Sequence, residues 1–124
     1  MSSFVHFDVP TENLERAKTF YETILGWKIT PVPGPMEYYD IETKNDDGSI
    51  GLAGGMGIRG APDQKITNFI GVSSVDEYVE KVKEHGGTII MPKMTVPGFG
   101  YLATFLDTEK NMLGLWETDS NATE

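Results

Sequence analysis

The chain opens with apolar and polar residues in alternation, the pattern of a β-strand with one buried face. Within residues 4–9, Phe7 and Val9 share one face of the predicted strand, while His6 and Asp8 share the other. Such a strand buries its apolar side, so we expect His6 and Asp8 to point away from the helices.

The rest of the first half continues with a helix and three more strands. Apolar residues recur at helical spacing over 14–25, and Gly26 follows as a C-cap. Strands are predicted at 27–29, 38–43 and 50–56, the last two joined by a hairpin turn. Four glycines in or beside the last strand predict a bulge or a close approach at the backbone: Gly51, Gly54, Gly55 and Gly57.

The same order of elements returns in the second half, after a linker at 57–65. A strand is predicted at 68–73, and a helix begins in a capping box formed by Ser74 and Glu77. Residues 91–100 have the composition of a loop that either closes over a ligand or merely connects two strands. The remaining strands are predicted at 88–91, 101–106 and 112–117.

This repeated order indicates an internal duplication. A shift of 63 residues superimposes His6 on Phe69, and residues 50–52 on residues 113–115. We therefore predict an α+β fold in a single domain built from two βαβββ modules. The modules are expected at about 4–57 and 66–117, followed by a polar tail at 118–124.

Composition narrows the classes of function. The chain has 124 residues, no cysteine and a net charge of −9. Disulfides and thiolate chemistry are excluded, and nucleic acid is a poor partner because its binding needs clustered basic residues. No apolar run approaches the about 20 residues that span a membrane, and the N-terminus has no signal-peptide pattern. We expect a cytoplasmic protein that binds neither nucleic acid nor membranes.

Several segments resemble one known superfamily, that of glyoxalases, bleomycin-resistance proteins and extradiol dioxygenases (the vicinal oxygen chelate superfamily). Residues 14–21, Leu-Glu-Arg-Ala-Lys-Thr-Phe-Tyr, resemble its ERAxxFY helix. Residues 107–111 resemble its DPEGN turn but depart from it at Thr108 and Lys110. The resemblance extends over about residues 4–117 and is closest to the short, poorly characterised glyoxalase-like branch.

The resemblance implies a curved mixed sheet that forms a cup, with metal ligands on the first and last strand of each module. In this chain the four ligand positions are His6, Gly54, Phe69 and Glu117. Gly54 and Phe69 cannot coordinate an ion, so the set is incomplete. The cofactor is therefore either a divalent metal (Zn, Ni, Mn or Fe) held partly by His6 and Glu117, or none.

His6 and Glu117 are the candidate catalytic residues, and each has a plainer interpretation. A lone strand histidine is more often a hydrogen-bonded structural residue than a ligand. Glu117 shares a strand face with Leu113 and Leu115, where a charge is costly unless it is solvated, paired or metal-bound. We expect Glu117→Gln to leave stability nearly unchanged or to raise it, because it removes a desolvated charge.

Other residues are candidates for the lining of the cup. We expect Phe4, Asp8, Tyr39, Phe69, Phe99 and Tyr101 to line it, with Tyr38 lining it or covering its mouth.

Two functions from different classes follow. One is a glyoxalase-related enzyme, a lyase or isomerase that acts on an oxygenated metabolite through a metal at His6 and Glu117. The other is a metal-free protein that sequesters a planar or cationic small molecule, as bleomycin-resistance proteins do. A structural or regulatory domain with an empty cup is a third reading. The superfamily also implies a homodimer.

Overall fold

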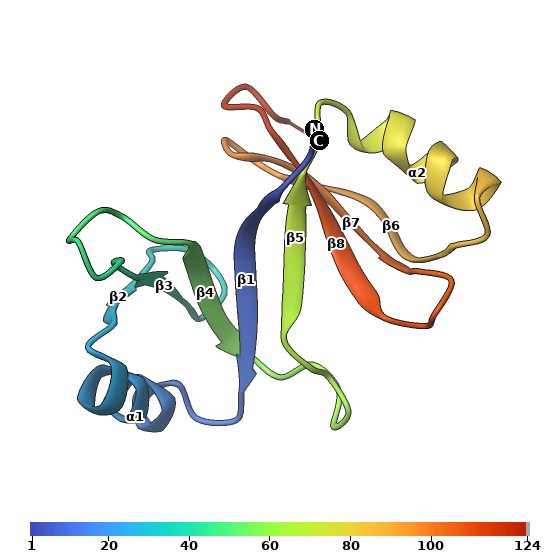
Figure 1. Ribbon diagram of the computed structural model, residues 1–124. Helices are drawn as coiled ribbons and strands as arrows, with labels where there is room; N and C mark the ends of the chain where they lie inside the picture. Colours follow the sequence, from blue (N-terminus) through green and yellow to red (C-terminus); the bar gives the residue numbers. More distant parts are fainter. Residues whose placement is uncertain (124) are drawn as a thin grey trace. The chain divides into compact units, whose positions relative to one another are not determined.

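The computed structural model describes residues 1–123, which form eight strands and two helices (Figure 1). Glu124, the last residue of the expected tail, lies outside the described residues. Contacts divide the chain into two compact units. Residues 6–67 form the first module, and residues from 68 onward together with 1–5 form the second. The predicted α+β class and the two βαβββ modules are confirmed.

The first module is a four-stranded mixed sheet with one helix. Its strands lie in the order β2-β3-β4-β1, in which β1 and β4 are parallel and the other pairs are antiparallel. The elements are β1 (Phe4–Thr11), α1 (Leu14–Leu25), β2 (Lys28–Pro31), β3 (Tyr38–Glu42) and β4 (Ala53–Ile58).

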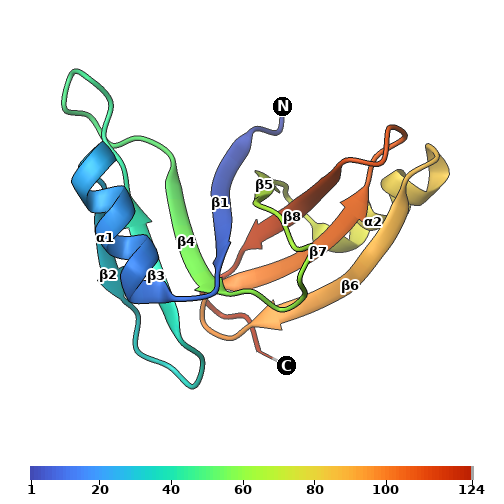
Figure 2. The ribbon, with the colours of Figure 1, turned by 90° about the horizontal axis from the view of Figure 1, so that it is seen from below.

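Helix α1 begins and ends at residues suited to those positions. The Asn13 side chain accepts a hydrogen bond from the Arg16 amide at 2.9 Å, which satisfies one of the free amides of the first turn. At the other end Gly26 takes a φ of 70°, which favours glycine. The helix lies against one face of the sheet (Figure 2), and the residues buried between them are Val9, Leu14, Ile29, Ile41 and Met56.

The second module repeats this topology. Its strands lie in the order β5-β8-β7-β6, again with the first and last strands of the module parallel. The elements are β5 (Thr67–Gly71), α2 (Val75–Glu84), β6 (Thr88–Val96), β7 (Gly100–Leu106) and β8 (Met112–Thr118). Ser74 caps α2 by accepting from the Glu77 amide at 3.1 Å, as the sequence predicts. The core under α2 contains Val75, Ala103, Phe105 and Leu115.

One expectation about the second module is wrong. Residues 91–96 are not loop but continue β6, whose pairing with β7 shifts register twice. The residues that follow the last strand are also bonded to the module. The Asp119 amide donates to the Phe99 carbonyl at 2.8 Å, and Ala122 is 1% exposed. These backbone hydrogen bonds hold the chain end against the β6–β7 turn.

Gly100 offers a test of the β7–β8 pairing. A Cβ at this position would lie 2.0 Å from the Glu117 carbonyl oxygen of the neighbouring strand. Backbone cannot rotate out of the way, so we expect Gly100→Ala to lower the free energy of unfolding by about 2 to 3 kcal/mol in urea titrations. Gly60→Ala is the control, because its Cβ would meet only the Gln64 side chain at 3.4 Å. Equal stability of the two variants would contradict this packing.

Candidate functional site

His6, Asp8 and Tyr38 form a hydrogen-bonded network in the first module. His6 Nε2 lies 2.9 Å from Asp8 Oδ1 and 3.1 Å from the Tyr38 hydroxyl. That hydroxyl donates to the same Asp8 oxygen at 2.6 Å. The side chains of His6 and Asp8 are 30% and 37% exposed, so solvent or a ligand can reach them.

The network lies on the sheet face that α1 does not cover. Phe7 and Val9, which alternate with His6 and Asp8 along β1, pack in or against the core under the helix. His6, Asp8 and Tyr38 therefore lie on the face of this module that α1 does not cover. The predicted orientation of His6 and Asp8 relative to the helix is confirmed.

Glycine makes room for Tyr38 on this face. Gly55 of β4 lies opposite Asp8, and a Cβ on Gly55 would be 1.7 Å from the Tyr38 hydroxyl oxygen. Tyr38 therefore extends across bare backbone to reach Asp8. On the other face, a Cβ on Gly54 would be 2.5 Å from the Phe7 ring. The close approach predicted from the glycines is confirmed at Gly54 and Gly55.

The Tyr38 hydroxyl is held in its neutral form. Burial, then the charge of Asp8 and the hydrogen bond to it, and finally the charge of Asp40 raise its pKa above the ordinary value of 10.0. Tyr38 is therefore a hydrogen-bond donor to Asp8 throughout the neutral range.

Asp40 adds a second carboxylate to the same face. In the sheet register Asp8 and Asp40 both pair with Gly55, one from each neighbouring strand. Neighbouring strands lie about 4.8 Å apart, so the two aspartates flank the glycine with their Cα atoms about 10 Å apart. The face is therefore acidic, with His6 as its basic group.

Glu117 has a different environment, within the second module. Its Oε1 accepts a hydrogen bond from the Val75 amide at 2.9 Å, at the first residue of α2. The neighbours that share its strand face, Leu113 and Leu115, pack in or against the core under α2. Glu117 therefore lies on the helix-covered face of its module, where it satisfies a free helix amide and faces the positive end of the helix dipole.

A cation completes the surroundings of Glu117. Lys93 Nζ lies 2.9 Å from Asp76 and 4.3 Å from the centre of the Tyr101 ring. The hydrogen bond to Asp76 raises the pKa of Lys93, and the charges of Asp76 and Glu117 add to this effect. Glu117 is thus integrated into the packing at the start of α2.

The residues present do not fit the expected metal. The register places Ala53 beside His6, while Gly54 packs under Phe7 on the opposite face. Phe69 is buried with its ring against Gly114. Within residues 1–123 there is no group of three or more side chains able to hold a metal ion. Each module contains one of the two expected ligands, and Glu117 is already bonded to α2.

The other predicted lining residues have separate locations. Tyr39 packs against the core under α1, and its hydroxyl donates to Glu15. Tyr101 packs against the core under α2. Strand alternation turns both side chains toward the helix of their own module. Phe4 and Phe99 are exposed, at 54% and 64%.

The sequence interpretation missed the pairing of Tyr38 with Asp8 and the role of Asp40. Alternation along residues 38–42 was the available signal, because apolar Ile41 implies that Tyr39 points to the core with it, and Tyr38 and Asp40 away from it. The hydrogen bond itself joins residues 30 positions apart and has no local signal.

Comparison with known proteins finds a family model and curated relatives that match in sequence. Residues 3–44, which contain β1 to β3, match the family model for the bleomycin resistance protein-like N-terminal domain. A Mycobacterium tuberculosis protein named "Putative glyoxylase CFP32" is 32% identical over 117 residues. The match covers 90% of this chain and 44% of that protein, so the chain spans less than half the length of its curated relative.

Solved structures agree over nearly the whole chain. Methylmalonyl-CoA epimerase in complex with methylmalonyl-CoA and NH4+ superimposes with a TM-score of 0.71 at 10% identity, covering 100% of this chain and 99% of the other. Hypothetical protein BH1468 from Bacillus halodurans gives 0.68 at 16% identity, with 99% of both chains covered. At these identities the likeness shows the fold. None of the described helices has both the length and the apolar character of a membrane span.

Substitution of Glu117 tests its hydrogen bond to α2. The sequence alone predicts that Glu117→Gln leaves stability unchanged or raises it. The hydrogen bond from the Val75 amide to the Glu117 carboxylate reverses this expectation. We now expect Glu117→Gln to lower the free energy of unfolding by about 1 kcal/mol and Glu117→Ala by about 2 kcal/mol, measured in urea. An increase in stability in the Gln variant would show that the charge is not favoured at this helix end.

The raised pKa of Tyr38 predicts a loss of stability in alkali. Below about pH 10 folded and unfolded chains both keep the phenol proton, whereas at higher pH the unfolded chain releases it first. The free energy of unfolding should therefore fall more steeply above about pH 10 in the wild type than in Tyr38→Phe. Urea unfolding at a series of pH values measures both slopes, and parallel curves would contradict the shift.

Proposed function

We propose that the chain belongs to the glyoxalase/bleomycin-resistance/extradiol-dioxygenase (vicinal oxygen chelate) superfamily, which its matches in sequence support, and that it binds a cationic small molecule. The proposed site is the uncovered face of the first module, at His6, Asp8 and Tyr38. The observation that carries this proposal is the hydrogen-bonded network of these three side chains on a face without a helix.

The charges on this face favour a cation. Asp8 and Asp40 flank Gly55, and the Tyr38 hydroxyl lies over that glycine. Two like charges on one surface repel each other, so a cation bound beside them lowers the electrostatic energy. Asp8 is already oriented by Tyr38, which reduces the cost of ordering it when a ligand binds.

The proposal does not require a metal. Glu117 Oε1 accepts from the Val75 amide on the face that α2 covers, which differs from the uncovered face that His6 occupies in its own module. Sequestration without chemistry, as in bleomycin-resistance proteins, is consistent with the family model that matches residues 3–44. That segment contains all three residues of the network.

A second candidate is proton transfer by His6. Asp8 Oδ1 lies 2.9 Å from its Nε2, and a carboxylate in this position orients an imidazole. This candidate keeps the glyoxalase-related lyase or isomerase chemistry but assigns the base to His6 rather than to Glu117. The expected homodimer and cytoplasmic location stay predictions.

Binding of metal-free bleomycin tests the first candidate. We expect saturable shifts of the Gly55 and Gly57 amide resonances in NMR titrations of the full chain. Tyr38→Phe should weaken binding about tenfold, because it releases Asp8 from its oriented position. Tyr39→Phe is the matched control, since it removes the adjacent hydroxyl from the helix-covered face and should leave the affinity unchanged.

Turnover separates the two candidates. Conversion of methylmalonyl-CoA that is lost in both His6→Gln and Asp8→Asn would support proton transfer over sequestration. Equal loss of bleomycin affinity in Tyr38→Phe and Tyr39→Phe would contradict binding at this face, as would unchanged affinity in both.

A further inference from the structure

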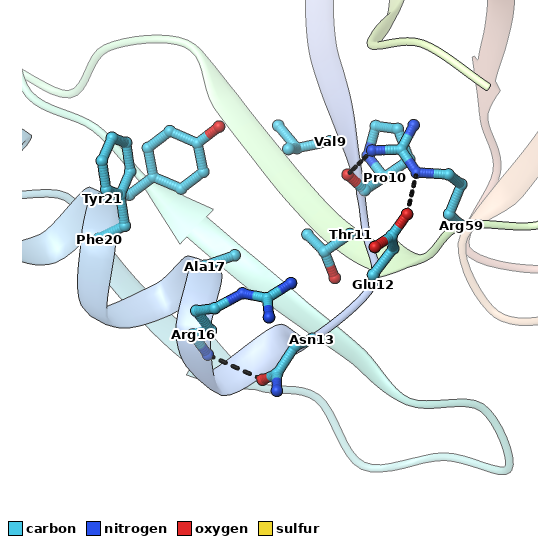
Figure 3. A pocket seen from close by; sticks show the side chains of 10 residues that line it. All are labelled: Val9, Pro10, Thr11, Glu12, Asn13, Arg16, Ala17, Phe20, Tyr21 and Arg59. Atoms are coloured by element: carbon cyan, nitrogen blue, oxygen red, sulfur yellow. Dashed lines mark hydrogen bonds and ion pairs between the residues drawn. The ribbon is translucent and has the colours of Figure 1, made fainter. Parts of the chain in front are cut away.

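The first module contains a second candidate site, a cavity of about 420 Å³ beside helix α1 (Figure 3). It lies between the end of β1, the first two turns of α1 and Arg59, and its volume falls in the range of small-molecule pockets. His6, Asp8 and Tyr38 do not line it. The lining residues on α1 are Arg16, Ala17, Phe20 and Tyr21.

Both arginines of the sequence line this cavity. The chain has ten basic residues, of which only Arg16 and Arg59 are arginines. They are 43 positions apart in sequence, and the fold brings them to one cavity. In a chain with a net charge of −9, this pair is a local exception to the charge of the surface.

The two guanidinium groups differ in how they are held. Arg59 is fixed by the Gln64 carbonyl, by the Pro10 carbonyl at 3.4 Å and by a long ion pair to Glu12 at 4.0 Å. Within residues 1–123, the Arg16 guanidinium makes no hydrogen bond or ion pair, and Figure 3 shows it extending from α1 toward Thr11. Arg59 is therefore already held in position, and the Arg16 guanidinium can donate hydrogen bonds to a ligand.

Aromatic surface completes the site. Phe20 is 57% exposed, and its ring meets that of Tyr21 edge-on with centroids 5.4 Å apart. An exposed phenylalanine beside an unpaired arginine suits a ligand with a flat apolar part and an anionic group. The start of α1 adds the positive end of its dipole in the same region.

We propose that this cavity binds a small aromatic or other flat apolar molecule that carries a carboxylate or a phosphate. The anion contacts Arg16 and Arg59, and the apolar part lies against Phe20. Glu12 competes with the ligand for Arg59. Its carboxylate is 74% exposed and holds Arg59 weakly, so the ligand anion can displace it. The proposal is independent of the site at His6.

NMR titration of the full chain with 1-naphthoate, 1-naphthyl phosphate and inorganic phosphate tests it. The first two probes distinguish a carboxylate from a phosphate ligand, and the third measures the anion alone. We expect saturable shifts at Ala17 and Phe20 with a naphthyl probe. Arg16→Gln should weaken its binding about tenfold and Glu12→Gln should strengthen it about threefold. Both positions are exposed, and circular dichroism checks that the variants fold.

Two controls make the result specific. Lys18→Gln removes the same charge from the same helix outside the cavity, and it should leave the affinity unchanged. Phe20→Ala should weaken the naphthyl probe but not inorganic phosphate. Equal weakening by Lys18→Gln and Arg16→Gln would overturn the proposal in favour of nonspecific charge attraction. Absence of saturable shifts with both naphthyl probes would overturn it directly.

Discussion

Burial of one face of each four-stranded sheet under a single helix decides which side chains are available for chemistry. Strand residues alternate between the two faces of the sheet. When one residue packs against α1 or α2, the residues before and after it in the strand therefore point to the other face. Val9 under α1 leaves Asp8 on the uncovered face, and Leu115 under α2 draws Glu117 to the covered one. The same constraint makes Tyr38 a functional candidate and Tyr39 a core residue.

The sequence predicted most of this order. The helix boundaries, the Ser74 and Gly26 caps, the repeated βαβββ topology and the orientation of His6 all follow from local patterns. The alternation of side chains along the last strand was also predicted correctly, because Glu117 does share a face with Leu113 and Leu115. The structure shows that this is the face that α2 covers. Two leucines beside a carboxylate were the signal for a helix-covered face, and a free helix amide supplied the partner that makes a charge tolerable there.

The duplication has preserved topology more strictly than register. In the first module His6 pairs with Ala53, whereas in the second Phe69 pairs with Gly114. A constant shift of 63 would have paired Phe69 with Trp116, so the two modules differ by two residues in this pairing. A slip of two keeps every side chain on its own face, while a slip of one would have exchanged the faces. When a ligand position is transferred through the sequence repeat, the sheet face of its side chain is therefore predicted correctly, but the residue beside it on the adjacent strand is not. This limits what the resemblance could predict about a set of metal ligands.

Opposite charges are segregated within the first module. The uncovered sheet face has Asp8 and Asp40 on either side of Gly55, while Arg16 and Arg59 converge beside α1. Sheet and helix both contribute to this separation, since β1 alternates polar and apolar residues and then leads through Pro10 and Thr11 to the start of α1. One short segment, from His6 to Phe20, thus contributes residues to both of the proposed sites.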